Sequence, residues 1–193
     1  MTEHNGNRET NVLKGALAGF IGGLVASWTM NQFQAALGKI MEGVEKSHGA
    51  QSLKPAGGQE SLYEMKREPE EESEEEKDAT EKVADAISEN IFGHKLDESE
   101  KETAGAVVHY AFGAAMGGVY GIAAEVAPEV CATLGLPFGA VFWLAADELA
   151  VPLVGLTAKP SEYSLSTHAY SLASHLVYGL TSEVVRRTVR NML

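Results

Sequence analysis

The chain of 193 residues, a length that fits one domain, lacks most features that identify a soluble enzyme or a secreted protein. It has one cysteine, Cys131, which excludes an internal disulfide and leaves the redox compartment undetermined. Its 15 basic against 27 acidic side chains argue against nucleic acid as a partner, because phosphate binding needs clustered Lys and Arg. It also lacks Cys-x-x-Cys, P-loop and Gly-x-Ser-x-Gly motifs. We therefore predict no catalytic residue, cofactor or metal ligand, and a protein that is not an enzyme.

Charge is absent over long stretches of the chain. The uncharged stretches are residues 15–38, 103–124 and 163–182, and a fourth, 130–158, is interrupted only by Asp147 and Glu148. About 20 uncharged residues, rising about 1.5 Å each in a helix, are enough to cross the ~30 Å hydrocarbon layer of a bilayer. A secretory signal peptide is the alternative for the first stretch, which is however longer than the ~7–15 residues of a signal hydrophobic region.

These stretches predict an all-α, polytopic membrane protein whose main partner is the lipid bilayer. The predicted transmembrane helices are 13–37, 103–126, 135–156 and 164–190, after an N-terminal tail of residues 1–12. Four crossings place both termini on one side of the membrane. Basic residues at the membrane ends, among them Lys14 and Arg190, favour the cytoplasmic side for the termini.

Most of the charge lies between the first two predicted spans. Residues 39–103 hold 19 of the 27 acidic and 9 of the 15 basic side chains, which is about −10 of the net charge of −12. We therefore predict an acidic extramembrane insert over 38–102. Its like-charge run at 67–78 (REPEEESEEEKD) is expected to be extended or disordered.

The end of this insert has a helical pattern of apolar residues. Val83, Ile87 and Ile91 lie four residues apart and predict a short amphipathic helix over 79–92. Such a helix packs on the protein's own surface or on lipid head groups; the alternative is that it docks a partner.

Glycines recur every four residues in the first two predicted spans. The series are Gly15, Gly19 and Gly23 in the first helix and Gly113, Gly117 and Gly121 in the second. Without side chains on one ridge, two helix backbones approach closely, which stabilises association in lipid. We expect these ridges to pack the two helices on each other. A homo-oligomer or membrane-complex contact is the main alternative, and a glycine-lined pore is a more distant one.

Ionisable side chains at membrane depth predict two polar clusters, because such groups usually face the bundle interior and have partners. Helical spacing gives an outer cluster of His109, Asp147, Glu148 and His168 with His175 near mid-membrane, and an inner boundary set of Glu125, Glu183, Arg186 and Arg187. Ion pairing at the interface is the expected role of the inner set. For the outer set, structural contacts, a proton-responsive or solute-binding site, and metal or haem ligation remain open.

The second half of the chain also resembles a known family. The matching runs are His109 to Tyr120-Gly121, Ala124-Glu125-Val126 with Pro128, Gly155-Leu156-Thr157 with Pro160, and Ser174-His175-Leu176-Val177 through Glu183, Arg186-Arg187 and Arg190-Asn191. These runs are similar to those of the YagU-type family of bacterial inner-membrane proteins; the first helix matches in character only. The resemblance implies a multi-pass inner (cytoplasmic) membrane protein of uncharacterised activity, in a family with some members associated with acid tolerance.

Three classes of function follow from these observations. The leading hypothesis is a small proton-linked permease or sensor in pH or envelope homeostasis that uses the outer cluster. The second is an accessory or scaffolding subunit that assembles a membrane complex through its glycine ridges. The third is a haem- or metal-binding membrane protein.

Overall fold

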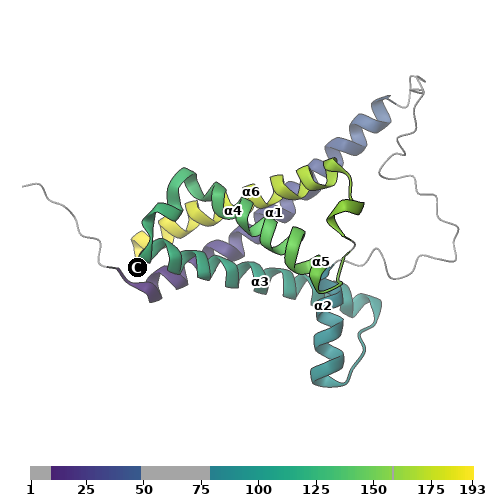
Figure 1. Ribbon diagram of the computed structural model, residues 1–193, viewed down its shortest axis with the longest axis horizontal. Coiled ribbons are helices and arrows are strands. Elements are labelled where there is room, and N and C mark those ends of the chain that lie inside the picture. The colour runs from purple at the N-terminus through teal and green to yellow at the C-terminus, as the bar shows by residue number, and fades with distance from the viewer. Residues whose placement is uncertain (1–9, 49–78, 158) are drawn as a thin grey trace, which may run out of the picture.

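The computed structural model describes residues 10–48, 79–157 and 159–193, and within them every regular element is a helix (Figure 1). The helices are α1 (Val12–His48), α2 (Ala79–Ile87), α3 (Glu98–Val126), α4 (Leu136–Trp143), α5 (Val151–Leu153) and α6 (Leu165–Met192), with the shorter segments η1 (Ser88–Phe92), η2 (Pro128–Gly135), η3 (Leu144–Ala150) and η4 (Pro160–Glu162). The all-α prediction is thereby confirmed. The acidic run 67–78 and most of the predicted tail lie outside the described residues.

Within the part of the chain that the structure describes, three helical stretches are long and apolar enough to cross a membrane. They are Val12–Lys39, Glu98–Val126 and Pro128–Leu153, so the chain has the helices of a multi-pass membrane protein. The polar helix α6 is not among them, and the fourth predicted span stays a prediction.

The distribution of side chains fits a lipid environment. Large apolar residues point outward, such as Leu13 on α1, Val107 on α3 and Leu153 on α5, with 79%, 64% and 82% of their surface exposed. In contrast, Ser174 and Glu183 are fully buried. Polar groups inside and apolar groups outside are the arrangement that a hydrocarbon solvent favours.

Helix α3 begins five residues before the predicted start because Asp97 forms a capping box. The Asp97 side chain accepts from the N–H of Glu100 at 2.9 Å, and the Glu100 side chain accepts from the N–H of Asp97 at 2.8 Å. These bonds satisfy two donors that the helix end would otherwise leave open. The N–H of Glu100 also stabilises the ionised carboxylate and so holds the pKa of Asp97 below its ordinary value.

The third predicted helix is continuous from α4 to α5 but widens to a π-helix in η3, which carries Asp147 and Glu148. Pro152 has no N–H to donate to the carbonyl of Glu148, so the regular pattern cannot continue through it. The N–H of Val151 instead reaches back to the carbonyl of Ala146. Such π-helical turns frequently occur at functional sites.

The bundle places helix α1 against α3 and α6, and α4 against α6. The start of α1 and the end of α6 lie at the same end of the bundle, where Lys14 Nζ donates to the carbonyl of Leu193 at 2.5 Å. Helix α2 lies at the opposite end, beside the first turns of α3 (Figure 1).

Candidate functional site

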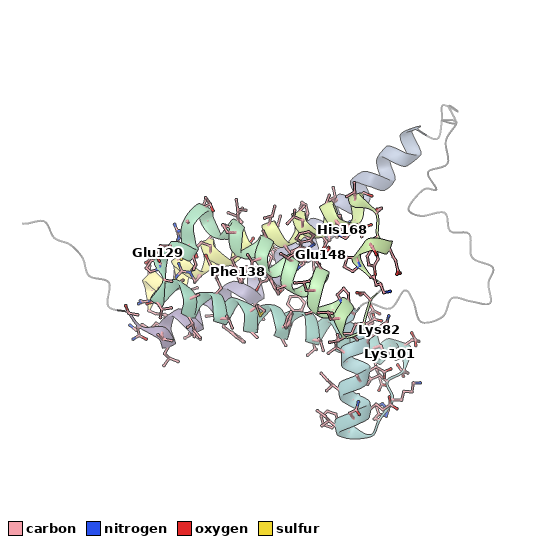
Figure 2. All side chains as sticks on the ribbon, viewed as in Figure 1. Lys82, Lys101, Glu129, Phe138, Glu148 and His168 are labelled. Atoms are coloured by element: carbon pink, nitrogen blue, oxygen red, sulfur yellow. The ribbon has the colours of Figure 1, made fainter. Side chains whose placement is uncertain are left out.

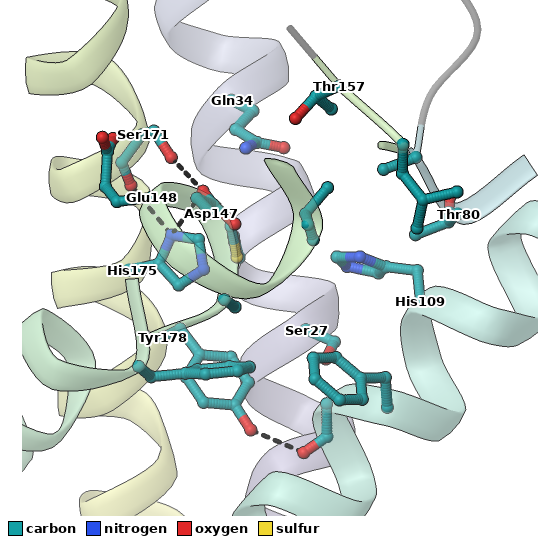
Figure 3. A pocket seen from close by; sticks show the side chains of 18 of the residues that line it. Ser27, Gln34, Thr80, His109, Asp147, Glu148, Thr157, Ser171, His175 and Tyr178 are labelled. Carbon is teal, nitrogen blue, oxygen red and sulfur yellow. Dashed lines mark hydrogen bonds and ion pairs between the residues drawn. The ribbon is translucent and has the colours of Figure 1, made fainter. Parts of the chain in front are cut away.

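A cavity of about 630 Å³ lies at the end of the bundle away from Leu193. Helices α1, α3 and α6 and segment η3 form its walls, and Lys82 of α2 lines it as well (Figures 2 and 3). All five residues of the predicted outer cluster line this cavity: His109, Asp147, Glu148, His168 and His175. The structure thus brings together side chains from three different helical segments.

The pair His168–Glu148 holds one proton in a short contact. His168 Nδ1 lies 2.6 Å from Glu148 Oε1, and His168 Nε2 lies 3.0 Å from the carbonyl oxygen of Pro160. A carbonyl only accepts, so Nε2 carries a hydrogen. The Nδ1 contact then contains either an imidazolium donating to a carboxylate or a neutral imidazole accepting from a carboxylic acid. In both forms the pair carries one exchangeable proton inside the cavity wall.

The second carboxylate of the cavity, Asp147, lies among the polar groups of α6. It accepts a hydrogen bond from the Ser171 hydroxyl, and His175 Nδ1 lies 3.6 Å from the same Asp147 oxygen. His175 Nδ1 donates to the carbonyl of Ser171 at 3.0 Å. His175 is buried, whereas 37% of the Asp147 side chain is exposed and faces the cavity. Asp147 is therefore the acidic group most accessible to a solute.

His109 reaches the cavity from the other wall. Figure 3 shows its ring projecting from α3 toward the space in front of Asp147. The cavity thus has histidine nitrogens on both sides and carboxylates on one. Such a lining offers both donors and acceptors to a small polar solute.

Aromatic side chains form the floor of the cavity. Phe142 packs edge-on against the His175 ring, with 5.3 Å between the ring centroids. It also packs at a tilt against Tyr178, with 5.2 Å between the centroids. The Tyr178 hydroxyl donates to the carbonyl of Gly113 at 2.5 Å and so ties α6 to α3. Below them Phe138 stacks on Tyr120 at 4.3 Å. This aromatic group separates the cavity from the other half of the bundle.

The buried carboxylate of Glu183 lies beyond that aromatic group. It accepts from Arg186 Nε at 2.7 Å, from Arg187 Nε, and from the Tyr120 hydroxyl at 2.9 Å. Arg186 is 4% exposed and also contacts Cys131 Sγ at 3.4 Å. Glu183 therefore forms the ion pairs that the helical spacing predicts, with a tyrosine added from α3.

Glu125 belongs to a separate pair. Its carboxylate accepts from Arg190 at 2.6 and 3.1 Å and from the N–H of Asn11 at 2.9 Å. The sequence predicted Arg186 or Arg187 in this position. Those two side chains are instead drawn to Glu183, which lies three and four residues before them on the same helix face.

The predicted glycine ridges of α1 and α3 face each other in antiparallel register. A Cβ atom at Gly15 would lie 2.6 Å from the carbonyl oxygen of Gly121, and one at Gly19 would lie 2.8 Å from the Cα of Gly121. Gly23 and Gly113 are matched in the same way further along. No side chain fits at these positions, so the two backbones pack at the closest distance that helices allow.

A protein-family model described as "Protein of unknown function (DUF1440)" matches residues 65–184. The chain belongs to this family. The matched region contains all five cavity residues of the predicted cluster, as well as Glu125 and Glu183. No match was found among curated proteins or among solved structures.

Several groups that line this cavity were not predicted. Lys82 lines the cavity from α2 and donates to the carbonyl of Leu156 at 3.0 Å, and Ser171 binds Asp147. Ser171 lies four residues before His175 and so on the same face of α6, a spacing that could have indicated it. Nothing in the sequence places α2 beside the cavity. Among the described residues, no three His, Cys, Asp or Glu side chains are arranged to hold a metal ion.

Proposed function

We propose that the protein is a small membrane permease that binds a polar solute in this cavity and moves it together with a proton. The cavity, lined by three histidines and two carboxylates at one end of an apolar helical bundle, is the observation that carries the proposal. Ionisable groups are costly at membrane depth, and they are found mainly where a solute or proton pathway uses them.

The proton of this mechanism is the one shared by His168 and Glu148. Their 2.6 Å contact lets the proton reside on either partner, and both side chains line the cavity. A solute that binds beside Asp147 changes the electrostatic potential at this pair. Binding of solute and exchange of the proton are therefore coupled through their common cavity.

The aromatic floor supplies the barrier that a permease needs. In this proposal Phe142 and Tyr178, which line the cavity and pack on each other, form the closed gate on the side of Glu183. Movement of these rings, or of α4 against α6, would connect the cavity to the opposite side. The widened helix of η3 lies directly beside this floor and gives α4 a natural point of bending.

The same proposal includes the finer placement of the chain in a membrane. Helix α6 is the fourth span, with the face that carries its buried polar residues turned toward α1 and α4 and its exposed apolar residues, such as Leu180 and Val184, turned toward lipid. Lys14, Arg186 and Arg190 gather at one end of the bundle, which favours the cytoplasm for that end. The resemblance to inner-membrane proteins supports a bacterial cytoplasmic membrane.

The scaffolding alternative receives less support. It needs glycine ridges that are available to a partner, whereas Gly19 and Gly117 pack against each other's helix within this chain. A Cβ atom at either position would collide with backbone atoms. The cavity therefore offers a better basis for function than the ridges.

The test is flux into liposomes that contain the purified protein and a trapped pH-sensitive dye. Small polar solutes of each charge type are added outside, and internal acidification is followed together with uptake of the labelled solute. We expect one class to enter with protons. The double variant His109→Ala, Asp147→Asn abolishes the flux, and Glu148→Gln uncouples it from the proton.

The matched control is Glu129→Gln, which removes the same charge at an exposed position outside the cavity and leaves the flux unchanged. Each variant must elute from size exclusion in detergent as the unsubstituted protein does. Equal flux through the double variant, or acidification without any solute dependence, would refute the permease.

A further inference from the structure

The segment formed by α2 and η1 ends in an exposed apolar tip. Ile87, Ile91 and Phe92 have 43%, 70% and 76% of their surface exposed, although the residues around them are mostly polar or charged. Their spacing places them together at the far end of the segment. Three large apolar side chains at one such place indicate a surface that another apolar phase covers.

The position of this tip is fixed by contacts between α2 and the start of α3. Lys101 Nζ lies 3.7 Å from Asp85 Oδ2, and Asp85 Oδ1 accepts from the N–H of Leu96 at 3.1 Å. The Glu81 side chain lies so close to Gly105 that a Cβ atom there would come within 2.7 Å of it. The segment is therefore held against the bundle at one end, with its tip pointing away from it.

The contacts place α2 at the level where the membrane begins. Gly105 stands next to the start of the uncharged stretch of α3 at Thr103, and Val107, one half-turn further, is 64% exposed. Figure 1 shows α2 running across the long axis of the bundle at this level. A helix that crosses spanning helices at the hydrocarbon boundary runs along the membrane surface.

From this geometry we infer that the tip of the α2–η1 segment inserts into the lipid surface, with Ile87, Ile91 and Phe92 among the head groups and upper acyl chains. The apolar tip then continues the lipid-facing surface of α3. Interfacial helices bind with an apolar face immersed to about 5–10 Å. The inference is independent of the proposed permease, since it needs only that α3 spans the membrane.

The charge of the segment indicates whether the tip binds an anionic or a zwitterionic lipid surface. Residues 79–97 contain four acidic and two basic side chains, so attraction to anionic lipids does not contribute. Insertion depends on the apolar residues alone, and a zwitterionic phosphatidylcholine surface is sufficient for it. The segment thereby tethers Lys82, which lines the cavity, to the membrane surface.

The test uses a nitroxide spin label on the full chain in phosphatidylcholine vesicles. In a Cys131→Ser background, the label is attached at Phe92→Cys or Ile91→Cys, and at Glu89→Cys as the matched control. Glu89 is exposed in the same segment and lies on the opposite side of the helix from Ile87 and Ile91. Power saturation then compares collisions with oxygen, which partitions into lipid, and with a water-soluble nickel chelate.

We expect oxygen to relax the label at position 92 or 91 more strongly than nickel does, and the reverse order at position 89. Equal nickel access at positions 92, 91 and 89 would overturn the inference, because the tip would then lie in water. Dipolar broadening at position 92 that grows with the protein-to-lipid ratio would also overturn it, because the cover would then be a second copy of the chain.

Discussion

At the residue scale, Glu183 is held by several contacts at once. It is fully buried, and it accepts hydrogen bonds from two arginines of its own helix and from Tyr120 of α3. Three donors compensate for removing one carboxylate from water, and the carboxylate in turn neutralises the buried guanidinium of Arg186. The pair therefore depends on both partners, because either charge alone is strongly disfavoured in the interior.

Removing the charge of Glu183 is expected to destabilise the bundle. Glu183→Gln keeps the size of the side chain but leaves Arg186 buried without a counter-ion, which costs about 3–5 kcal/mol of unfolding free energy. The measurement is unfolding in mixed micelles, compared with Glu129→Gln at an exposed site. For the control we expect a change within about 0.5 kcal/mol. Equal stability of the two variants would contradict the role of this ion pair.

At the scale of the elements, close backbone contact joins two pairs of helices, α1 with α3 and α4 with α6. The α1–α3 pair meets along its glycine ridges, and α4 meets α6 at Gly139 and Gly179, where a Cβ atom on Gly179 would lie 2.9 Å from the Cα of Gly139. Lipid gives helices no hydrophobic reason to associate, so dispersion contacts and weak Cα–H···O bonds stabilise these interfaces. Each interface is thus sensitive to a single methyl group.

The substitution Gly19→Ala tests that sensitivity. Its Cβ atom would overlap backbone atoms of Gly117 and Gly121, which cannot move as a side chain can. Overpacking of this kind costs about 1–3 kcal/mol, seen as a lower melting temperature in detergent. Gly38→Ala is the control on the same helix, since nothing lies within 4 Å of its added Cβ atom. For Gly38→Ala the melting temperature should stay the same or rise, because alanine favours the helix. A Gly19→Ala protein that melts at the same temperature as the unsubstituted protein would refute the close contact.

At the scale of the whole molecule, the sequence predicted where the helices lie better than it predicted which side chains and segments contact one another. Uncharged stretches locate the spans because their length must match the bilayer, and helical spacing collects His168 and His175 on one face of α6. The pairing of Glu125 with Arg190 could not be predicted, because spacing along one helix does not determine which of its arginines binds a carboxylate on another helix. The position of α2 beside the cavity depends on Asp85 and Lys101, whose contact joins segments that no periodicity relates.

The passage of α6 through the membrane is the remaining claim about the whole molecule. In a Cys131→Ser background, single cysteines at Thr10 and Met192 probe the end of the bundle that holds Leu193, and cysteines at Lys95 and Ser161 probe the cavity end; all four positions are exposed. A four-span bundle requires Thr10→Cys and Met192→Cys to react with an impermeant maleimide from one side of oriented vesicles. Lys95→Cys and Ser161→Cys then react only from the other side. Labelling of Ser161→Cys and Met192→Cys from the same side would show that α6 does not cross the membrane, and the cavity would then lack its membrane-embedded wall.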